Sequence, residues 1–193
     1  MSEPRPHAMF AATYIHRQAV LLLALIATAA FAGEPLGADM IFQAPNVVPL
    51  SPRLVTSGQP TADALSRLAT QGFGAVIYLA PPTVPTAVAG EADIVRGQGL
   101  EFVNIPIKSG KPTEADFRAF IAAMKKFRDR KVLVHCQANL RASSMTFLYR
   151  VIVDHESPET AYEPVTQVWS PEGSWKRLIT TQLKKAGIIF DPY

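Results

Sequence analysis

Cysteine is nearly absent from this chain, and charge of neither sign dominates it. Cys136 is the single cysteine among 193 residues, so an internal disulfide is excluded. The 19 Lys and Arg stand against 16 Asp and Glu, a near balance that does not favour a nucleic-acid surface. No internal repeat is visible. The composition therefore favours an ordinary globular protein without disulfides and without nucleic-acid partners.

Clusters of metal-binding side chains are also lacking. The stretch Asp154-His155-Glu156 holds three ionisable side chains, but consecutive residues at a predicted helix end do not converge on one metal. No second cluster accompanies it. We therefore expect no metal site and no cofactor, and chemistry that rests on the side chains alone.

The chain does have one long apolar run near its start, residues 19–32, which follows Arg17. Ala30 and Ala32 precede Gly33 in the small-x-small pattern of a cleavage site, so residues 1–32 are predicted to be a secretory signal peptide cleaved after Ala32. The run is shorter than the ~20 residues that span a bilayer, so membrane attachment is expected only if this segment stays uncleaved. The mature protein is predicted to be periplasmic or exported.

Residues 33–46 contain several Pro and Gly and are predicted to be a linker, followed by a single domain at residues 47–193. Hydrophobic periodicity predicts strands at 54–56, 75–79, 102–105 and 132–135, and helices at 62–70, 88–97, 114–127, 142–154, 158–168 and 175–186. The last two helices each follow a serine suited to capping, Ser157 and Ser174. The alternation predicts an α/β fold with a mostly parallel sheet of about four to five strands flanked by helices.

The stretch that says most about function is Lys131-Val-Leu-Val-His-Cys136-Gln-Ala-Asn-Leu-Arg141. In it a predicted buried strand ends at a cysteine, and a short loop leads from the cysteine to an arginine. Parallel sheets bind ligands at the carboxyl ends of their strands, where Cys136 is expected. Loop amides and the positive end of the following helix favour an oxyanion there. The same field, with Arg141 nearby, stabilises a thiolate, so Cys136 is expected to be nucleophilic at neutral pH.

Arg141 adds a planar fork of donors that matches two oxygens of a phosphoryl group. A lone thiol in an oxidising compartment also indicates a cysteine retained for its reactivity, at the risk of oxidation. Taken alone, a cysteine at a strand end is more often a small buried hydrophobe, but the loop and the arginine favour a nucleophile. The predicted loop consists of His135, Gln137, Ala138, Asn139, Leu140, Ala142 and Ser143 around the pair Cys136 and Arg141.

These residues carry a family resemblance. His135-Cys136 followed by Arg141 and Ser143 resembles the signature loop of cysteine-based protein tyrosine phosphatases, the compact dual-specificity type in particular. The resemblance implies a dual-specificity-phosphatase-like fold. It also implies a phosphatase that works through a cysteinyl-phosphate on Cys136, with a phosphorylated protein or small molecule as substrate.

A second stretch narrows the resemblance. Leu54-Val-Thr-Ser-Gly-Gln-Pro60, followed by a helical segment and then Gly72-Phe-Gly-Ala-Val-Ile-Tyr-Leu79, is similar to the bacterial phosphatase-like domain also found fused to β-lactamase-like hydrolases. The likeness extends roughly from Val47 to Val153. Ser57-Gly-Gln-Pro60 itself shows no obvious chemistry, and we interpret it as a turn that holds the first strand against the sheet.

One departure leaves alternatives open. The phosphatase signature has one residue more between its Cys and Arg, whereas Gln137, Ala138, Asn139 and Leu140 alone intervene here. This shorter spacing also occurs in the bacterial phosphatase-like domain and in rhodanese-type sulfurtransferases, which carry a persulfide on Cys. A sulfurtransferase and a non-catalytic phosphate-binding module therefore remain alternatives.

Two loop residues have expected roles of their own. Asn139 stands where phosphatase loops usually carry Gly, and Asn tolerates the left-handed conformation that a tight turn needs. Ser143 stands where phosphatases place a hydroxyl that helps the thiolate leave, although an ordinary Ser of the first helical turn fits equally well. His135 is expected to orient the loop through hydrogen bonds and not to act as a base.

The general acid is harder to assign. The resemblance implies an Asp on a loop upstream of the nucleophile, and the corresponding stretch 107–116 offers Asp116, with Glu114 as a weaker candidate. Thr113 and Asp116 also have the spacing of a capping box, which gives Asp116 a structural role. An enzyme with a poor acid favours leaving groups that are already stable. Phosphotyrosine-like aryl phosphates are therefore the expected substrates.

Overall fold

The computed structural model describes residues 43–191. All described residues belong to one compact unit. The predicted signal peptide and most of the predicted linker lie outside the described residues. No helix within residues 43–191 is long and apolar enough to cross a membrane.

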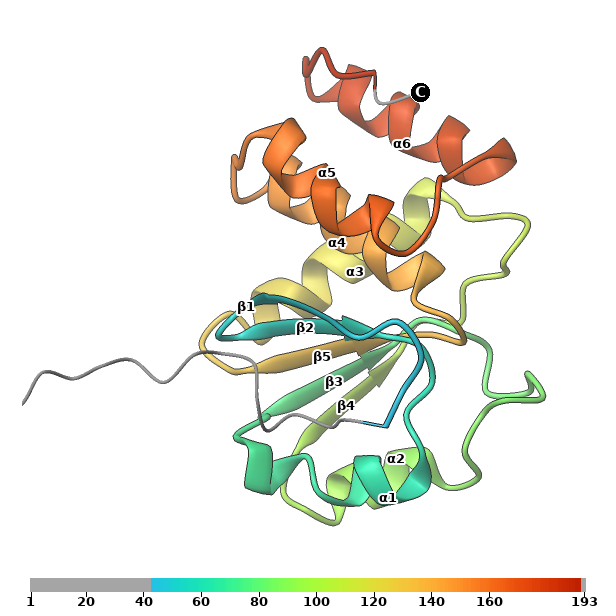
Figure 1. Cartoon of the computed structure of the whole chain (residues 1–193), viewed down its shortest axis with the longest axis vertical. Helices are drawn as coiled ribbons and strands as arrows, with labels where there is room; N and C mark the ends of the chain where they lie inside the picture. Colours follow the sequence, from blue (N-terminus) through green and yellow to red (C-terminus); the bar gives the residue numbers. More distant parts are fainter. Residues whose placement is uncertain (1–42, 192–193) are drawn as a thin grey trace, which may run out of the picture. The chain divides into compact units, whose positions relative to one another are not determined.

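A sheet of five strands forms the centre of this unit, in the order β1-β2-β5-β3-β4 (Figure 1). The strands are β1 (Val48–Ser51), β2 (Leu54–Ser57), β3 (Ala75–Tyr78), β4 (Glu101–Asn104) and β5 (Val132–His135). β1 pairs with β2 antiparallel, and the remaining pairs are parallel. The predicted mostly parallel α/β sheet is confirmed, with β5 at its middle.

β1 is the strand that the sequence analysis did not predict. It holds Pro49, and its pairing register shifts between Pro49 and Ser51. Proline cannot donate to a ladder and is tolerated at a sheet edge or a bulge. A four-residue edge strand in a proline-rich stretch therefore carries no strand-like pattern.

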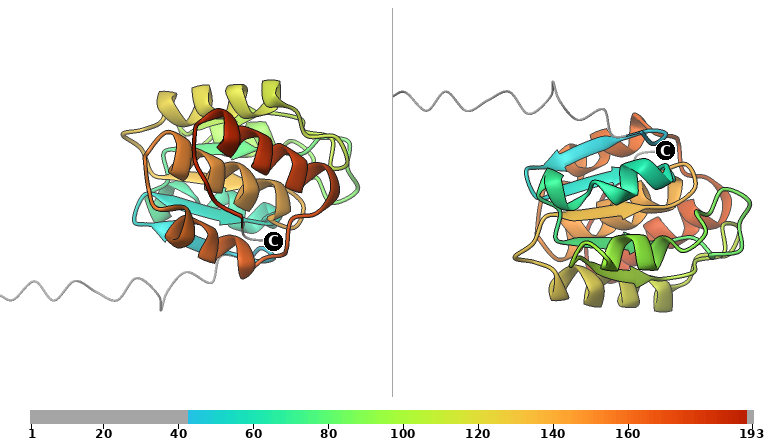
Figure 2. Two further views of the ribbon diagram at one scale, coloured as in Figure 1. Left: turned by 90° about the horizontal axis from the view of Figure 1, so that it is seen from above. Right: turned by 90° about the horizontal axis from the view of Figure 1, so that it is seen from below.

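Helices cover both faces of the sheet, as the two views of Figure 2 show. One face carries α1 (Ala62–Ser66) and α2 (Glu91–Arg96), and the other carries α3 (Glu114–Lys126), α4 (Leu140–Ile152), α5 (Pro158–Thr166) and α6 (Gly173–Lys185). The helix predicted at 62–70 is interrupted, and a 3-10 turn, η1 (Ala69–Gln71), follows α1. The helix predicted at 88–97 begins only at Glu91, because Gly90 adopts a left-handed conformation with φ of 70°.

The caps of the helices match the sequence analysis in part. Thr113 and Asp116 form the predicted capping box of α3, and the Ser157 hydroxyl caps α5. The predicted cap at Ser174 is wrong. Glu172 is the N-cap of α6 and makes no side-chain capping bond, so Ser174 already lies in the first turn. The helix therefore starts two residues before its first buried side chain, Trp175.

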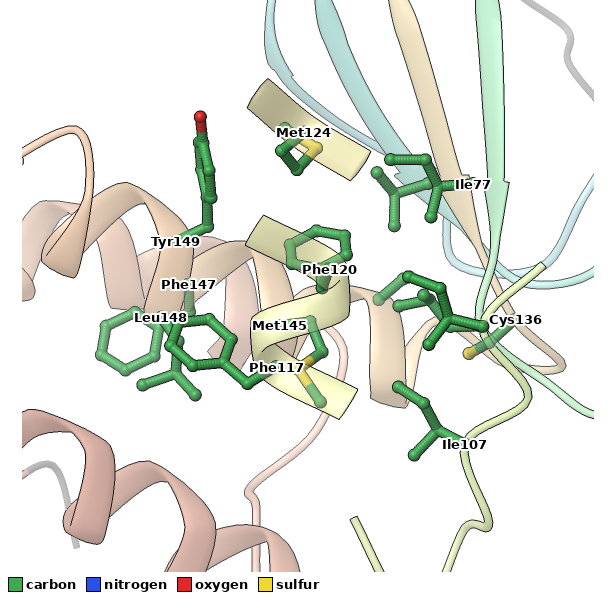
Figure 3. Close-up of a cluster of buried hydrophobic side chains, with 14 of the residues drawn as sticks. Ile77, Ile107, Phe117, Phe120, Met124, Cys136, Met145, Phe147, Leu148 and Tyr149 are labelled. Carbon is green, nitrogen blue, oxygen red and sulfur yellow. The ribbon is translucent and has the colours of Figure 1, made fainter. Parts of the chain in front are cut away.

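The core has two parts, one on each face of the sheet. In β5, Val132 and Val134 face the cluster under α3 to α6, and Leu133 faces the cluster under α1 and α2, as strand alternation requires. Figure 3 shows the larger cluster, in which Cys136 lies at one end on the side of Ile107. Because β5 and most of α4 are buried, the segment that joins them has rigid supports on both sides.

Candidate active site

The loop between β5 and α4 is held at both ends. Cys136 directly follows β5, is only 1% exposed, and its N–H donates to the Ser57 carbonyl over 3.2 Å. Asn139 is the N-cap of α4 and has a φ of 68°. The left-handed turn expected at Asn139 is confirmed, and it lets α4 begin at Leu140, two residues before the predicted start.

Several amides of this loop are left without a protein acceptor. Within the loop and the first helical turn, the N–H groups of Gln137, Ala138, Leu140, Arg141 and Ala142 donate to no acceptor among residues 43–191. The last three belong to the first turn of a 13-residue helix, whose N-terminus carries partial positive charge. Buried N–H groups are nearly always paired, so this arrangement is suited to receive the oxygens of an anion.

Arg141 lies in that first helical turn and is 4% exposed. Its Nε donates to the Ile107 carbonyl over 3.1 Å, and its Nη2 donates to Oε1 of Gln137 over 3.2 Å. The bond to Ile107 fixes one edge of the guanidinium and leaves the other edge for a ligand. The Gln137 amide, at the far side of the loop, is a neutral acceptor that an anion can replace.

The segment Ser57-Gly-Gln-Pro60 supports the loop from below. Gly58 forms a bridge with Ala138, and the Gln59 N–H donates to the Gln137 carbonyl over 3.0 Å. This segment is predicted above to be a turn that holds the first strand against the sheet. The structure shows that its backbone also binds a carbonyl group of the loop between β5 and α4.

Position 58 has no room for a side chain, so glycine is required there. A Cβ atom there would lie 2.8 Å from the Gln137 carbonyl oxygen and 2.9 Å from Cβ of Pro45. Non-bonded contacts of a Cβ atom are almost never this short, so a larger residue must push the loop away. The glycine of the Ser57-Gly-Gln-Pro60 segment therefore allows this segment to pack directly against the loop.

Residues 43–46, counted in the predicted linker, also contact the loop. The Asn46 side chain donates to the Ala138 carbonyl over 3.0 Å, and the Asn139 side chain donates to the Asn46 carbonyl over 2.7 Å. Asn139 also donates to Oγ1 of Thr56 over 3.0 Å. These reciprocal amide contacts stabilise the left-handed turn, a contribution that no local pattern indicates.

A buried polar network surrounds His135, the residue before Cys136 in the chain. Nε2 of His135 is 2.7 Å from Oε1 of Glu91, and Oε2 of Glu91 accepts a 2.9 Å hydrogen bond from the Gln59 side chain. The His135 ring stacks on Tyr78, with centroids 4.7 Å apart and planes 13° apart. Sequence reasoning missed Glu91, because an acidic residue at a helix start is ordinarily explained by the helix dipole.

Tyr78 reports the charges around this network. Burial, followed by the charge of Glu91, raises the pKa of Tyr78 to about 12, and the charge of Arg141 opposes this shift. Its hydroxyl donates to the Pro81 carbonyl over 3.4 Å. Tyr78 is therefore a neutral, stacked neighbour of His135 and not a proton donor at ordinary pH.

The remaining predicted site residues have structural contacts. Oδ2 of Asp116 accepts hydrogen bonds from the N–H and the hydroxyl of Thr113, at 2.8 and 2.7 Å. The Ser143 hydroxyl donates to the Leu140 carbonyl over 3.1 Å. A hydrogen bond from Lys185 holds the pKa of Glu114 below its ordinary value, which makes Glu114 a poor proton donor. The acid roles and the role of Ser143 stay predictions.

A cysteine at the carboxyl end of the central strand, followed by an amide-lined turn and a buried arginine, defines a protein-tyrosine-phosphatase-like domain of the dual-specificity type. Residues 47–179 match the family model described as a dual-specificity-type phosphatase fused to NAD+ kinase. The chain belongs to this family, and the predicted resemblance is confirmed.

Known proteins support the assignment. A β-lactamase hydrolase-like protein of Xylella fastidiosa is 34% identical over 110 residues, which are 55% of this chain and 25% of that protein. This chain therefore spans about a quarter of the length of that curated relative. A DUF442 crystal structure from Shewanella putrefaciens is 30% identical, with a TM-score of 0.69 over 79% of this chain and 98% of that one. PTPMT1, at 19% identity, shares the fold with a TM-score of 0.61 over 73% of this chain and 96% of that one.

Proposed function

We propose that this protein is a cysteine-dependent phosphatase that hydrolyses phosphate monoesters, with phosphotyrosine-like aryl phosphates as preferred substrates. The observation that carries the proposal is the set of unpaired loop amides around Cys136, combined with a buried Arg141 whose orientation is fixed by Ile107. Family membership supports a phosphatase, and the geometry supplies the residues that would perform the reaction.

The reaction would proceed in two displacements. The Cys136 thiolate attacks phosphorus, so that a sulfur–phosphorus bond forms, the ester oxygen–phosphorus bond breaks, and the alcohol or phenol leaves. Water then attacks the cysteinyl-phosphate, which releases inorganic phosphate and regenerates the thiol. The loop amides and Arg141 bind the non-bridging oxygens, whose charge they stabilise in both transition states.

The preference for aryl phosphates follows from the weakness of the acid candidates. Asp116 shares its Oδ2 with the cap of α3, and Glu114 is held by Lys185. A phenol leaves as a comparatively stable anion, whereas an alkoxide needs a proton. We further propose that the mature protein acts in the periplasm or outside the cell, where the predicted signal peptide would direct it.

Sulfur transfer remains the second candidate, because the loop places Arg141 one residue earlier than the usual phosphatase signature. In that reaction thiosulfate would give its sulfane sulfur to the Cys136 thiolate, which yields a persulfide and releases sulfite. A nucleophilic acceptor such as cyanide would then remove the sulfane sulfur and regenerate the thiolate. A smaller loop has fewer amides for a phosphoryl group, and this is the observation that favours the alternative.

The test is phosphate release from p-nitrophenyl phosphate with metals chelated, compared between the wild-type protein and Cys136→Ser. We expect turnover in the wild-type protein and none in the variant, with the thiol shown to be reduced by titration. Thiosulfate-to-cyanide transfer is measured on the same samples. Turnover of thiosulfate alone would replace the phosphatase by a sulfurtransferase, and binding of phosphate without any turnover would indicate a binding module.

A further inference from the structure

The segment between β4 and α3 supplies the carbonyl that orients Arg141, and most of this segment is exposed. Ile107 is fully buried, whereas residues 108–111 are exposed and form a tight turn, in which the Lys111 N–H donates to the Lys108 carbonyl over 3.0 Å. Exposed turns with few contacts are ordinarily among the more mobile parts of a fold. A carbonyl next to such a turn keeps its direction only if the turn is held in place.

A side chain from a distant helix holds this turn. Nε1 of Trp175, in the first turn of α6, donates to the Ser109 carbonyl over 2.7 Å. Among residues 43–191, no other hydrogen bond joins residues 108–112 to a distant segment. Ser109 lies two residues after Ile107, so the bond fixes the chain within about 7 Å of the carbonyl that Arg141 contacts.

Trp175 is firmly packed and can therefore act as an anchor. It is 4% exposed and belongs to the larger core cluster, together with Leu178 and Ile179 of the same helix. Its ring meets the Trp169 ring edge-on, with centroids 6.3 Å apart and planes 75° apart. α6 is the outermost helix on this side of the sheet (Figure 1). One indole N–H thus attaches the exposed turn to the packed interior.

The neighbouring tryptophan provides a comparison within the same protein. Nε1 of Trp169 is buried, yet it has no hydrogen-bond partner among residues 43–191. The two indoles touch each other, but only the indole of Trp175 bonds to a carbonyl. Loss of the indole N–H therefore removes a tertiary hydrogen bond at Trp175 and none at Trp169.

We propose that Trp175 is a positioning residue for the anion-binding site. Its indole N–H fixes the turn at residues 108–111, the turn fixes the Ile107 carbonyl, and that carbonyl orients Nε of Arg141. In this way α6 acts on the site through the segment that joins β4 to α3. This role rests on the oxyanion site of the proposed function and not on the hydrolysis of a phosphate ester.

The test is the affinity of Trp175→Phe for inorganic phosphate, measured by calorimetric titration. Phenylalanine keeps a ring in the core but has no N–H, so the turn loses its bond to α6. We expect phosphate to bind about fivefold more weakly, which corresponds to the net contribution of one hydrogen bond. Trp169→Phe is the matched control, because it removes an indole N–H that has no partner. Its phosphate affinity should equal that of the wild-type protein.

A double-mutant cycle separates positioning from a general loss of structure. Arg141→Lys has already lost the bond to Ile107, so adding Trp175→Phe to it should weaken phosphate binding by less than about twofold. Equal losses in the two backgrounds would overturn the proposed role. Unchanged affinity in a folded Trp175→Phe protein, or a wild-type protein that binds no phosphate, would overturn it as well. Non-additive losses in a protein that does not hydrolyse p-nitrophenyl phosphate would support Trp175 and separately reject the proposed hydrolysis.

A second measurement uses the wild-type protein. Coupling between two sites is reciprocal, so a Trp175 bond that favours phosphate binding must itself be favoured by bound phosphate. Hydrogen exchange of the two indole N–H groups is followed by NMR, with their signals assigned by means of Trp169→Phe. Saturation with phosphate should slow the exchange of Trp175 more than that of Trp169, which reports the general stabilisation. Equal slowing of both indoles would contradict the role of Trp175 even if Trp175→Phe fails to fold.

Discussion

The Ile107 carbonyl accepts a 3.1 Å hydrogen bond from Nε of Arg141, and this bond joins the segment after β4 to the first turn of α4. Ile107 is itself 0% exposed, and its N–H donates to the Leu79 carbonyl over 3.3 Å. The orientation of the guanidinium is therefore set by backbone atoms at the carboxyl ends of two strands. The rotamer of Arg141 is therefore fixed before an oxyanion binds, and this lowers the entropy cost of binding.

Substitution of Arg141 should separate charge from geometry. Arg141→Lys keeps one positive charge but loses the bond to Ile107 and the planar fork, so we expect inorganic vanadate or phosphate to bind at least about tenfold more weakly. Calorimetric titration of both proteins checks this result. Lys125→Arg, on the exposed side of α3, is a control in which anion affinity should not change. Equal affinities of Arg141→Lys and wild type would show that only the charge matters.

Gly58→Ala should damage the loop from beneath. The added methyl group would meet the Gln137 carbonyl at 2.8 Å, so the loop or residue 45 must move. We expect unfolding to become easier by about 1–3 kcal/mol, as for overpacked interior sites, together with a loss of phosphate affinity. Thermal unfolding and phosphate titration measure the two effects. Gly110→Ala, where an added methyl group meets no atom within 4 Å, is the control. Unchanged phosphate affinity in Gly58→Ala would contradict the support role.

Asp116 can be tested for two roles at once. Asp116→Asn weakens the capping box of α3, and we expect a loss of stability of about 1 kcal/mol, measured by urea unfolding. If the carboxyl also protonates the leaving group, turnover of phenyl phosphate should fall far more than turnover of p-nitrophenyl phosphate, which leaves without a proton. A loss that is equal for both substrates would remove Asp116 from the chemistry and leave it as a cap.

Stability should fall at alkaline pH because of Tyr78. Its folded-state pKa is raised to about 12 by burial and by Glu91, whereas the pKa of an unfolded tyrosine lies near the ordinary value of 10.0. The folded state thus retains a proton that the unfolded state loses. The stability that this raised pKa provides is complete below pH 10 and disappears as the pH rises from about 10 to about 12. Urea unfolding across this range, compared between wild type and Tyr78→Phe, should show a steeper decline in the wild type. Parallel curves would contradict the assignment.

Much of the fold was predictable because its signals are local. The alternation of short apolar strands with helical segments indicated the mostly parallel sheet, and β5 begins and ends where it was predicted. The loop from Cys136 to Arg141 was recognisable for the same reason, since its residues are neighbours in the chain. Asn139 was expected in a left-handed turn from its residue type alone.

Other features depended on contacts between distant segments. The antiparallel edge strand β1, the amide contacts of Asn46 with Ala138 and Asn139, and the role of Gly58 have no local pattern. At Ser174 a local pattern was present but wrong. Ser174 is a good capping residue, yet α6 begins one residue earlier, at Gly173. Local preference is worth about 1 kcal/mol at a cap, so the packing of a whole helix overrides it.

By itself the sequence determined the class of fold and predicted the position of the loop from Cys136 to Arg141, because these depend on hydrophobic periodicity and on residues adjacent in the chain. Only the tertiary structure decided which groups surround that loop. Glu91 and His135 stand far apart in the sequence and meet because α2 packs beneath the carboxyl end of β5. Ile107 reaches Arg141 because parallel strands end at one edge of the sheet. These few polar contacts affect stability strongly because they are buried: a charge removed from water costs free energy unless a group of the protein pairs with it.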